Sequence, residues 1–485
     1  MKRVHGERLS AFEAACWHLE RSAQPLHAGS LYLLEGPLDF ERTLGMVEHY
    51  LAAMPRWGAR VLPVPLELAS PIWVPARHFD IRQHVMRHVL RQPADDTRLE
   101  RLASRILAQP LDRRRPLWEV HQIDGYRQDR SALLVKVHHC LLGGVHGSAL
   151  EQQLFEVSPR SRSADPAPPS GGSSPPGELH GGALRRVAEA ALDAVTATLG
   201  GVRSAVTDPL GAAGRAREHA LAAADLLRMI ATGAPPSPLN GHVSTLRRVA
   251  WTRLPLAEVR AVKARLGGKT ADVVLTVVAG ALRGWLESQG QTVDRLELRA
   301  LCPTAVRDAR GTRLSIVVMP LPVGILDPVE RLRQVRAARE HLEREEAPRR
   351  TARALALLAS APQPLQRPLG WLELQTLRVN TICTTAPAAP VRLYLQGQRV
   401  ETVVPLVPLA QGVGLAFGVL AYTDHIVIGA TYDPALLRAA DGIVSRMPET
   451  LGVLRELAEH SREPGRRPST PSPAGSRNPV PPRVA

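Results

Sequence analysis

The stretch VKVHHCLLGGVHG, residues Val135 to Gly147, decides how this chain is interpreted. An apolar run of strand character leads into two adjacent histidines and then into a glycine-rich turn. Because adjacent side chains on an extended strand point to opposite faces, one histidine can face a cavity while the other packs inward. An imidazole with a pKa near 6.5 can take a proton from an alcohol or a thiol at neutral pH. His138 and His139 are therefore candidates for a site with one general base, although most such pairs are surface or structural histidines.

Length and composition favour a globular protein with a large core. The chain has 485 residues, of which 44% are hydrophobic, and this length predicts two or three domains. No CxxC pair occurs, which argues against a disulfide framework and against a zinc site. The first residues carry charges throughout, and no run of 18 uncharged apolar residues appears. We expect a cytosolic protein that does not span a membrane.

The net charge of +15 comes almost wholly from arginine, since only four of the 61 basic residues are lysines. Along the sequence the arginines are spread beside acidic residues and form no single basic block. Aromatic residues make up only 4%, so stacking surfaces for nucleic-acid bases are scarce. We expect no nucleic-acid binding, and attraction to an anionic lipid surface fits the charge at least as well.

Two segments are too polar and too rich in proline, glycine or serine to fold by themselves, namely residues 158–182 and 461–485. The first is interpreted as a linker and the second as a disordered basic tail. Between them, apolar residues recur at helical spacing over 184–199 and 212–230. We expect these helices to pack on the protein's own core; a lipid-facing role is the alternative.

Elsewhere, predicted helices alternate with short β-like runs without a strict βαβ rhythm, which indicates an α/β fold. The chain has no internal repeat and neither a GxGxxG nor a GxxxxGK[ST] phosphate loop. The predicted helices are 99–109, 256–266 and 270–289, and the predicted strands are 31–34, 132–137, 314–321, 378–384, 414–422 and 425–432.

The phrase PLDRRRPLWEV, Pro110 to Val120, followed about twenty residues later by VHH, resembles the bacterial wax ester synthase/diacylglycerol acyltransferase family. That family belongs to the HHxxxDG acyltransferase superfamily, together with chloramphenicol acetyltransferase and nonribosomal peptide condensation domains. The resemblance covers nearly the whole chain. Further matching segments are LSAFEAACWHLERSAQPLHAGSLYLLEG, PIWVPARHFDIRQHV, SPLNGHVSTLRRVAW, TADVVLTVVAGALRGWL, RALCPTAVRDARGTRLSIVVMPLPVGILDPVERL and GLAFGVLAYTDHIVIGATYD.

The resemblance implies two α/β halves of the chloramphenicol acetyltransferase type with an active-site channel between them. We expect an N-terminal half over 1–235, which carries the HH motif, the linker at 158–182 and helices over 183–232. The C-terminal half would then cover 236–460, followed by the tail at 461–485.

The resemblance also implies the chemistry. His139 would be the general base and His138 its structural neighbour. An acyl group would pass directly from acyl-CoA to diacylglycerol or a long-chain alcohol in a ternary complex, with no metal and no cofactor beyond the acyl-CoA substrate. Cys140 follows the base and is interpreted as a small apolar filler; an acyl-enzyme on its thiol is the alternative. This substrate class implies a peripheral association with the inner membrane or with lipid bodies.

The family's PLW phrase falls on Pro116, Leu117 and Trp118, which are expected to line or support the acyl-binding region, although Trp118 could equally be core. Asp112 and Arg115 in the same phrase are expected to form an ion pair that fixes the loop.

Three motif positions depart from the family. Gly143 stands where the family has an aspartate that mainly supports the histidine loop, while Gly144 is retained. The family's Asn-Asp pair appears as Ala271-Asp272, where Asp272 is expected to cap a helix, and its SNVPGP turn appears as TTAPAAP at 384–390. A loose base loses rate steeply. The chain is therefore interpreted as a divergent acyltransferase, with a catalytically impaired paralogue that binds lipid or acyl-CoA without turnover as the alternative.

Overall fold

The protein is described by a computed structural model over residues 7–21, 24–64, 70–76, 79–142, 153–159, 217, 234–308, 311–359, 379–386 and 391–460. Almost all of the predicted linker, all of the helices expected over 183–232 except residue 217, and the whole tail lie outside these residues. Gly143, Gly144 and positions 387–390 of the altered turn lie outside them as well.

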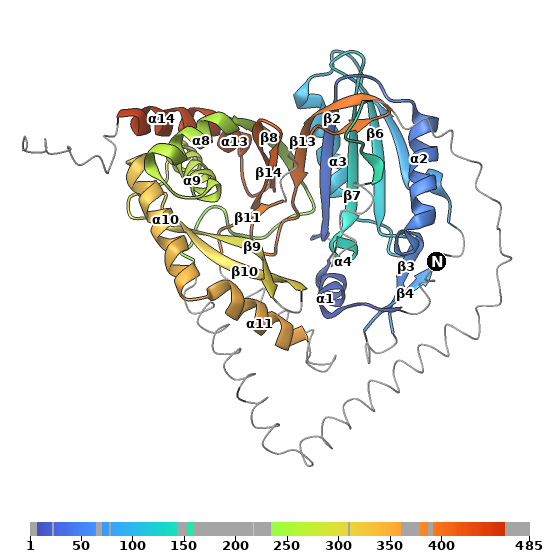
Figure 1. Cartoon of the computed structure of the whole chain (residues 1–485), viewed down its shortest axis with the longest axis horizontal. Coiled ribbons are helices and arrows are strands. Elements are labelled where there is room, and N and C mark those ends of the chain that lie inside the picture. Colours follow the sequence, from blue (N-terminus) through green and yellow to red (C-terminus); the bar gives the residue numbers. More distant parts are fainter. Residues whose placement is uncertain are drawn as a thin grey trace, which may run out of the picture.

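The two halves lie side by side, with the N-terminal half at the right of Figure 1. Its six-stranded sheet has the order β12-β13-β2-β7-β6-β5. These strands are β12 (Tyr394–Leu395), β13 (Gln398–Leu406), β2 (His27–Leu34), β7 (Arg130–His138), β6 (Trp118–Tyr126) and β5 (Val85–Val89). Helix α3 (Asp96–Ala108) packs on one face of the sheet, and α1 (Ala11–Leu19) and α2 (Phe40–Ala53) pack on the other.

The period-2 pattern of the central strands explains these two faces. Leu134 of β7 packs with the α3 side, whereas the next residue, Val135, packs with the α1 and α2 side. A small sheet of order β1-β4-β3 adjoins this half. Its strands and the short helices of this half are β1 (Glu7–Arg8), β4 (Ile72–Pro75), β3 (Ala59–Leu62), η1 (Pro55–Gly58), η3 (Ile81–Gln83) and α4 (His139–Leu142).

The C-terminal half has a second six-stranded sheet of order β10-β9-β11-β14-β15-β8. Its strands are β10 (Gly311–Leu321), β9 (Leu298–Asp308), β11 (Thr381–Thr385), β14 (Leu415–Tyr422), β15 (His425–Tyr432) and β8 (Arg248–Pro255). Its helices are α8 (Leu256–Leu266), α9 (Thr270–Ser288), α10 (Pro328–Arg344), α11 (Ala347–Ala359), α13 (Asp441–Ser445) and α14 (Met447–His460).

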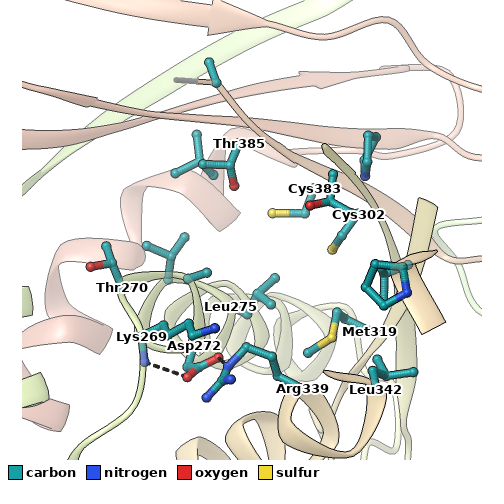
Figure 2. Close-up of a pocket in the computed structure, with 18 of the residues that line it drawn as sticks. Lys269, Thr270, Asp272, Leu275, Cys302, Met319, Arg339, Leu342, Cys383 and Thr385 are labelled. Atoms are coloured by element: carbon teal, nitrogen blue, oxygen red, sulfur yellow. Dashed lines mark hydrogen bonds and ion pairs between the residues drawn. The ribbon is translucent and has the colours of Figure 1, made fainter. Parts of the chain in front are cut away.

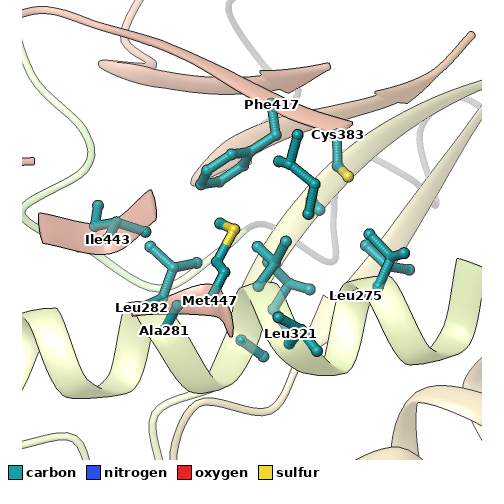
Figure 3. Packing of buried hydrophobic residues seen from close by; sticks show 14 of the residues in the cluster. Leu275, Ala281, Leu282, Leu321, Cys383, Phe417, Ile443 and Met447 are labelled. Carbon is teal, nitrogen blue, oxygen red and sulfur yellow. The ribbon is translucent and has the colours of Figure 1, made fainter. Parts of the chain in front are cut away.

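Helix α9 is apolar almost all round because it lies in the centre of this half. Figure 3 shows Leu282 of α9 next to Met447, with Phe417 reaching down from the sheet. A helix that is apolar on every side is stable only when it is covered on every side. The long apolar run read from the sequence at 270–289 is thus the core of the C-terminal half.

Strand β13 joins the two halves. It belongs to the second half in sequence but pairs antiparallel with β2 of the first sheet, and it crosses between the halves in Figure 1. The crossing requires glycine: a Cβ added to Gly429 of β15 would lie 2.1 Å from the carbonyl oxygen of Pro405, and one added to Gly418 would lie 2.8 Å from it. These two glycines are register partners, so β13 can approach the paired backbones closely.

The expected α/β architecture with two layered halves is confirmed. The limits of α8 and β15 agree with prediction to the residue, and Gly267 ends α8 with a positive φ of 77°. The division between 235 and 236 stays a prediction, but β12 and β13 lie within 236–460 and still belong to the first sheet. Among the residues that the structure describes, none of the helices is both long enough and apolar enough to cross a membrane.

Candidate active site

The dihistidine lies where β7 passes into α4. His138 is the last residue of β7 and pairs with His27 of β2, and His139 is the first residue of α4. The backbone N–H of His138 donates to the carbonyl of Leu117 at 3.0 Å, and that of His139 donates to the carbonyl of Leu26 at 2.8 Å. Backbone hydrogen bonds to two neighbouring segments therefore fix the position of both histidines.

The His138 ring is completely buried and held in one orientation. Its Nδ1 accepts from the backbone N–H of Cys140 at 3.1 Å, so the ring proton of the neutral tautomer resides on Nε2. That Nε2 lies 3.3 Å from Oε1 of Glu20. His138 is thus a structural histidine that links the loop to a carboxylate.

Glu20, the C-cap of α1, supplies that carboxylate. Its Oε1 also accepts from the backbone N–H of Leu26 at 3.1 Å, and its Oε2 accepts from Nε of Arg113 at 3.0 Å. Burial alone would raise the pKa of Glu20, but the hydrogen bond and charge of His138, the charge of Arg113 and the Leu26 amide lower it to about 2. Glu20 is therefore an anion beside the histidine loop at neutral pH.

Sequence reasoning did not find Glu20. The available signal was weak: a glutamate at the C-terminal end of a helix faces the negative end of the helix dipole, so it needs a compensating partner. Arg113 provides part of that compensation, and its guanidinium also stacks 3.8 Å over the Trp17 ring.

His139 differs from His138 in exposure. The residue is partly exposed, while its Nδ1 is shielded from solvent and has no hydrogen-bond partner among the described residues. Burial, and then the neighbouring charge of His138, lower the pKa of His139 to about 4. The imidazole is therefore neutral at pH 7 and can accept a proton.

Cys140 lies in the core, with no exposed surface. Burial raises the pKa of its thiol well above the ordinary value, and the carboxylate charges of Glu13 and Glu20 act in the same direction. Since the thiolate is the nucleophilic form, this environment opposes an acyl-enzyme on Cys140 and agrees with the filler interpretation.

The PLW phrase leads into β6, which pairs with the histidine strand β7 in the same sheet. Pro116 is buried, and Leu117 and Trp118 have no exposed surface. The indole N–H of Trp118 donates to the carbonyl of Trp57 at 2.7 Å. Leu117 also supplies the carbonyl that receives the His138 amide. The structure therefore places Trp118 in the core, from where the phrase supports the histidine strand.

The loop before this phrase is tied by Asp112. The guanidinium of Arg114 makes two 3.0 Å hydrogen bonds to the Asp112 carboxylate, and Arg115 lies 3.4 Å from it. The expected contact with Arg115 is present, but Arg114, which sequence reasoning did not name, is the closer partner.

A cavity of about 540 Å³ lies in the C-terminal half, between α9, α10 and the sheet (Figure 2). Cys302, Met319 and Cys383 contribute to its mainly apolar lining, and a charged group stands at one end. His139 is not among the residues that line it, so the channel expected to reach His139 stays a prediction.

Asp272 organises the charged end of this cavity. It is fully buried; its Oδ2 accepts from the backbone N–H of Lys269 at 2.7 Å, and its Oδ1 accepts from Nε of Arg339 at 2.8 Å. The first bond caps α9, and the second ties α9 to α10. Asp272 thus combines a cap with a buried ion pair that the sequence did not reveal.

Comparison with known families identifies the chain. Residues 9–274 match the wax ester synthase/diacylglycerol acyltransferase catalytic domain, and residues 310–455 match the C-terminal domain of the same family. The chain belongs to this family. The resemblance carried by the PLW and VHH phrases is therefore confirmed.

Relatives of this wax ester synthase/diacylglycerol acyltransferase family member cover nearly its whole length. A putative diacylglycerol O-acyltransferase of Mycobacterium tuberculosis is 30% identical over 476 residues, which span 94% of this chain and 92% of the relative. The solved wax ester synthase/diacylglycerol acyltransferase of Marinobacter aquaeolei VT8 is 22% identical, with a TM-score of 0.64 over 93% of this chain and 100% of that chain.

The family member also shares its fold with condensation domains. The first condensation domain of the calcium-dependent antibiotic synthetase is 16% identical, with a TM-score of 0.57 over 93% of this chain and 96% of that chain. At this identity the likeness concerns the fold alone. Within the described residues, no cluster of three or more His, Cys, Asp or Glu side chains could hold a metal ion.

Proposed function

We propose that this family member is an acyl-CoA-dependent O-acyltransferase that esterifies diacylglycerol or a long-chain alcohol, with His139 as the general base. Family membership and the M. tuberculosis relative support an acyltransferase of this class. The observation that carries the assignment of the base is the contrast within the dihistidine. His138 is sealed, with Nδ1 accepting from the Cys140 amide and Nε2 lying 3.3 Å from Glu20, whereas His139 is partly exposed and neutral.

The proposed step needs no cofactor and no side-chain nucleophile. The unprotonated imidazole of His139 takes the proton of the acceptor hydroxyl while that oxygen attacks the thioester carbonyl. The tetrahedral intermediate then collapses, the carbon–sulfur bond breaks, and the imidazolium returns its proton to the leaving sulfur. The products are an ester and free CoA. Proton transfer of this kind contributes about 10²- to 10⁴-fold to a rate.

This mechanism is tested by asking whether CoA release requires an acceptor. Purified full-length protein is given palmitoyl-CoA alone, with hexadecanol or with dioleoylglycerol, and both free thiol and ester are measured. Direct transfer predicts no thiol burst without acceptor and equal amounts of thiol and ester with it. Cys140→Ala should keep this behaviour. A stoichiometric burst without acceptor that Cys140→Ala removes would show an acyl-enzyme instead.

The second candidate is an impaired paralogue that binds lipid or acyl-CoA without turnover, and Gly143 favours it because the family's supporting aspartate is missing. Glu20 favours the active enzyme, because it already brings a carboxylate to the loop. Gly143→Asp separates the two readings. A gain in turnover of tenfold or more would support impairment. No change or a loss would support an active enzyme in which Glu20 compensates for the missing aspartate.

A further inference from the structure

Arginines that are scattered along the sequence converge at the junction of the two halves. A groove of about 870 Å³ lies between α3, the end of β5 and the start of β8. Its lining holds no aspartate or glutamate. Its six arginines are Arg91, Arg98, Arg101, Arg105, Arg247 and Arg248.

The arginines of α3 form one stripe. Arg98, Arg101 and Arg105 are spaced by three and four residues, so their side chains leave the helix on the same face. Leu99, on the buried face of the helix, packs against the N-terminal sheet. Like charges at this spacing repel one another and destabilise a helix, so the stripe has an electrostatic cost that an anion would relieve.

These arginines differ from those of α10 in their partners. Arg91, Arg98, Arg101, Arg105 and Arg248 are exposed, and none makes a side-chain hydrogen bond or an ion pair with a described residue. Helix α10 carries a similar stripe of arginines, but each arginine of that stripe has an acidic partner. Arg333 pairs with Glu330, Arg336 with Glu340, and Arg339 with Asp272 and Glu343.

The acids nearest the groove do not neutralise it. Asp96 is bonded to Tyr126 and Arg127. Burial, and then the charges of Asp96 and Asp441, raise the pKa of Glu100 to about 7, so this carboxyl carries only part of its charge at neutral pH. Asp433 acts on Arg247 and Glu100 acts on Arg248, but the lining itself holds six arginines and no carboxylate, so the groove stays cationic.

The rim of the groove is aliphatic. Val89 and Leu246 both line it, and they are 69% and 55% exposed. Exposed aliphatic side chains beside arginines are typical of protein surfaces that lie in a lipid headgroup layer. A nucleotide or nucleic-acid site would instead be expected to offer several aromatic rings for base stacking, and the lining has only the imidazole of His88 and no Phe, Tyr or Trp.

We propose that this arginine groove binds the phosphate groups of anionic phospholipids and seats the protein on a membrane surface, with Val89 and Leu246 reaching into the headgroup layer. The groove would be the surface through which the proposed acyltransferase contacts the membrane. The inference deepens the proposed function, but vesicle binding can be measured whether or not the chain turns over.

The test uses full-length protein and cosedimentation with vesicles of phosphatidylcholine, with or without an equal share of phosphatidylglycerol. Wild type should bind only the anionic vesicles, and binding should weaken as salt is raised. Since a basic residue near such a surface is worth about fivefold in partitioning, Arg98→Gln/Arg105→Gln should weaken binding by about 25-fold. Leu246→Gln should weaken it at unchanged net charge.

The matched control is Arg333→Gln/Arg349→Gln on α10 and α11, which removes the same charge from another surface and should weaken binding by less than about threefold. An equal loss in both double variants would overturn the groove assignment, because net charge or the basic tail would then account for binding. The assignment would also fail if the α3 variant bound vesicles normally but lost affinity for free coenzyme A, inorganic phosphate or duplex DNA.

Measuring turnover tests the proposed function independently of vesicle binding. With hexadecanol in detergent micelles, the α3 double variant should release CoA at the wild-type rate, because no groove residue takes part in the chemistry. A wild type that binds anionic vesicles but never releases CoA would refute the acyltransferase and leave the groove assignment standing.

Discussion

Glu20→Gln tests whether the carboxylate beside His138 holds the histidine loop. The substitution keeps the size of the side chain and removes the charge of a carboxylate whose side chain is only 7% exposed. The lowering of the Glu20 pKa from 4.5 to about 2 corresponds to at most about 3 kcal/mol of stabilisation of the charged form, because part of the lowering comes from the charge that His138 carries only when protonated. We expect Glu20→Gln to lower the free energy of unfolding by about 2–3 kcal/mol, because half-exposed Arg113 regains some solvent contact.

The sign of the pH dependence follows from the direction of the shift. Because the folded-state pKa of Glu20 is depressed, its stabilisation is fully present above pH 4.5 and is lost as the pH falls towards 2. Below pH 4.5, the gap between wild type and variant should therefore shrink by about 1.4 kcal/mol for each pH unit. Urea denaturation at pH 7 and at several lower pH values measures this gap.

Turnover is the second readout for this variant. Loosening the loop misplaces the base, and about 1 Å of misplacement can cost a hundredfold in rate, so kcat should fall ten- to hundredfold while KM changes little. Glu41→Gln, which breaks the exposed pair with Arg82, is the matched control and should leave both stability and kcat unchanged. If Glu20→Gln behaved like Glu41→Gln, Glu20 would not support the histidine loop.

Three further predictions concern pH, the charged end of the cavity and the strand crossing. With a His139 pKa of about 4, kcat/KM should change less than about twofold between pH 7.5 and 5.5. An imidazole with the ordinary pKa would lower kcat/KM about tenfold over the same range, so a tenfold loss in folded protein would contradict the assignment. Asp272→Asn should lower the free energy of unfolding, measured by urea titration, by about 3 kcal/mol, because it leaves Arg339 without its buried partner. Glu343→Gln, which removes the exposed partner of Arg339, should lower it much less. Equal effects would refute the buried pair. Gly429→Ala should destabilise the protein by at least about 2 kcal/mol in thermal unfolding, because the added Cβ would collide with the Pro405 carbonyl. Gly452→Ala in α14, where a Cβ would meet open space, should be neutral or stabilising. A neutral Gly429→Ala would refute the close crossing.

Local sequence pattern was sufficient for the elements whose cause is local. The apolar run at 270–289 predicted α9, and the glycine after Leu266 predicted the end of α8. Two adjacent histidines after a strand predicted a sheltered and a more open side chain, and the structure shows this difference between His138 and His139.

Features that depend on distant segments could not be predicted in this way. No period in the sequence indicates that β13 pairs with β2, about 370 residues away. Glu20 meets His138 only because α1 packs against α4, and the arginine groove forms only when α3 lies beside the start of β8. The arginines looked dispersed because their convergence is a property of the fold.

The central claim is that His139 removes the proton of the acceptor, and turnover of His139→Ala tests it most directly. CoA release from palmitoyl-CoA with hexadecanol or dioleoylglycerol is compared between wild type and His139→Ala at pH 7.5, after urea titration has shown that both are folded. We predict a loss of at least about a hundredfold in kcat with little change in KM. A His139→Ala protein that keeps more than about a tenth of the wild-type rate would show that the base lies elsewhere.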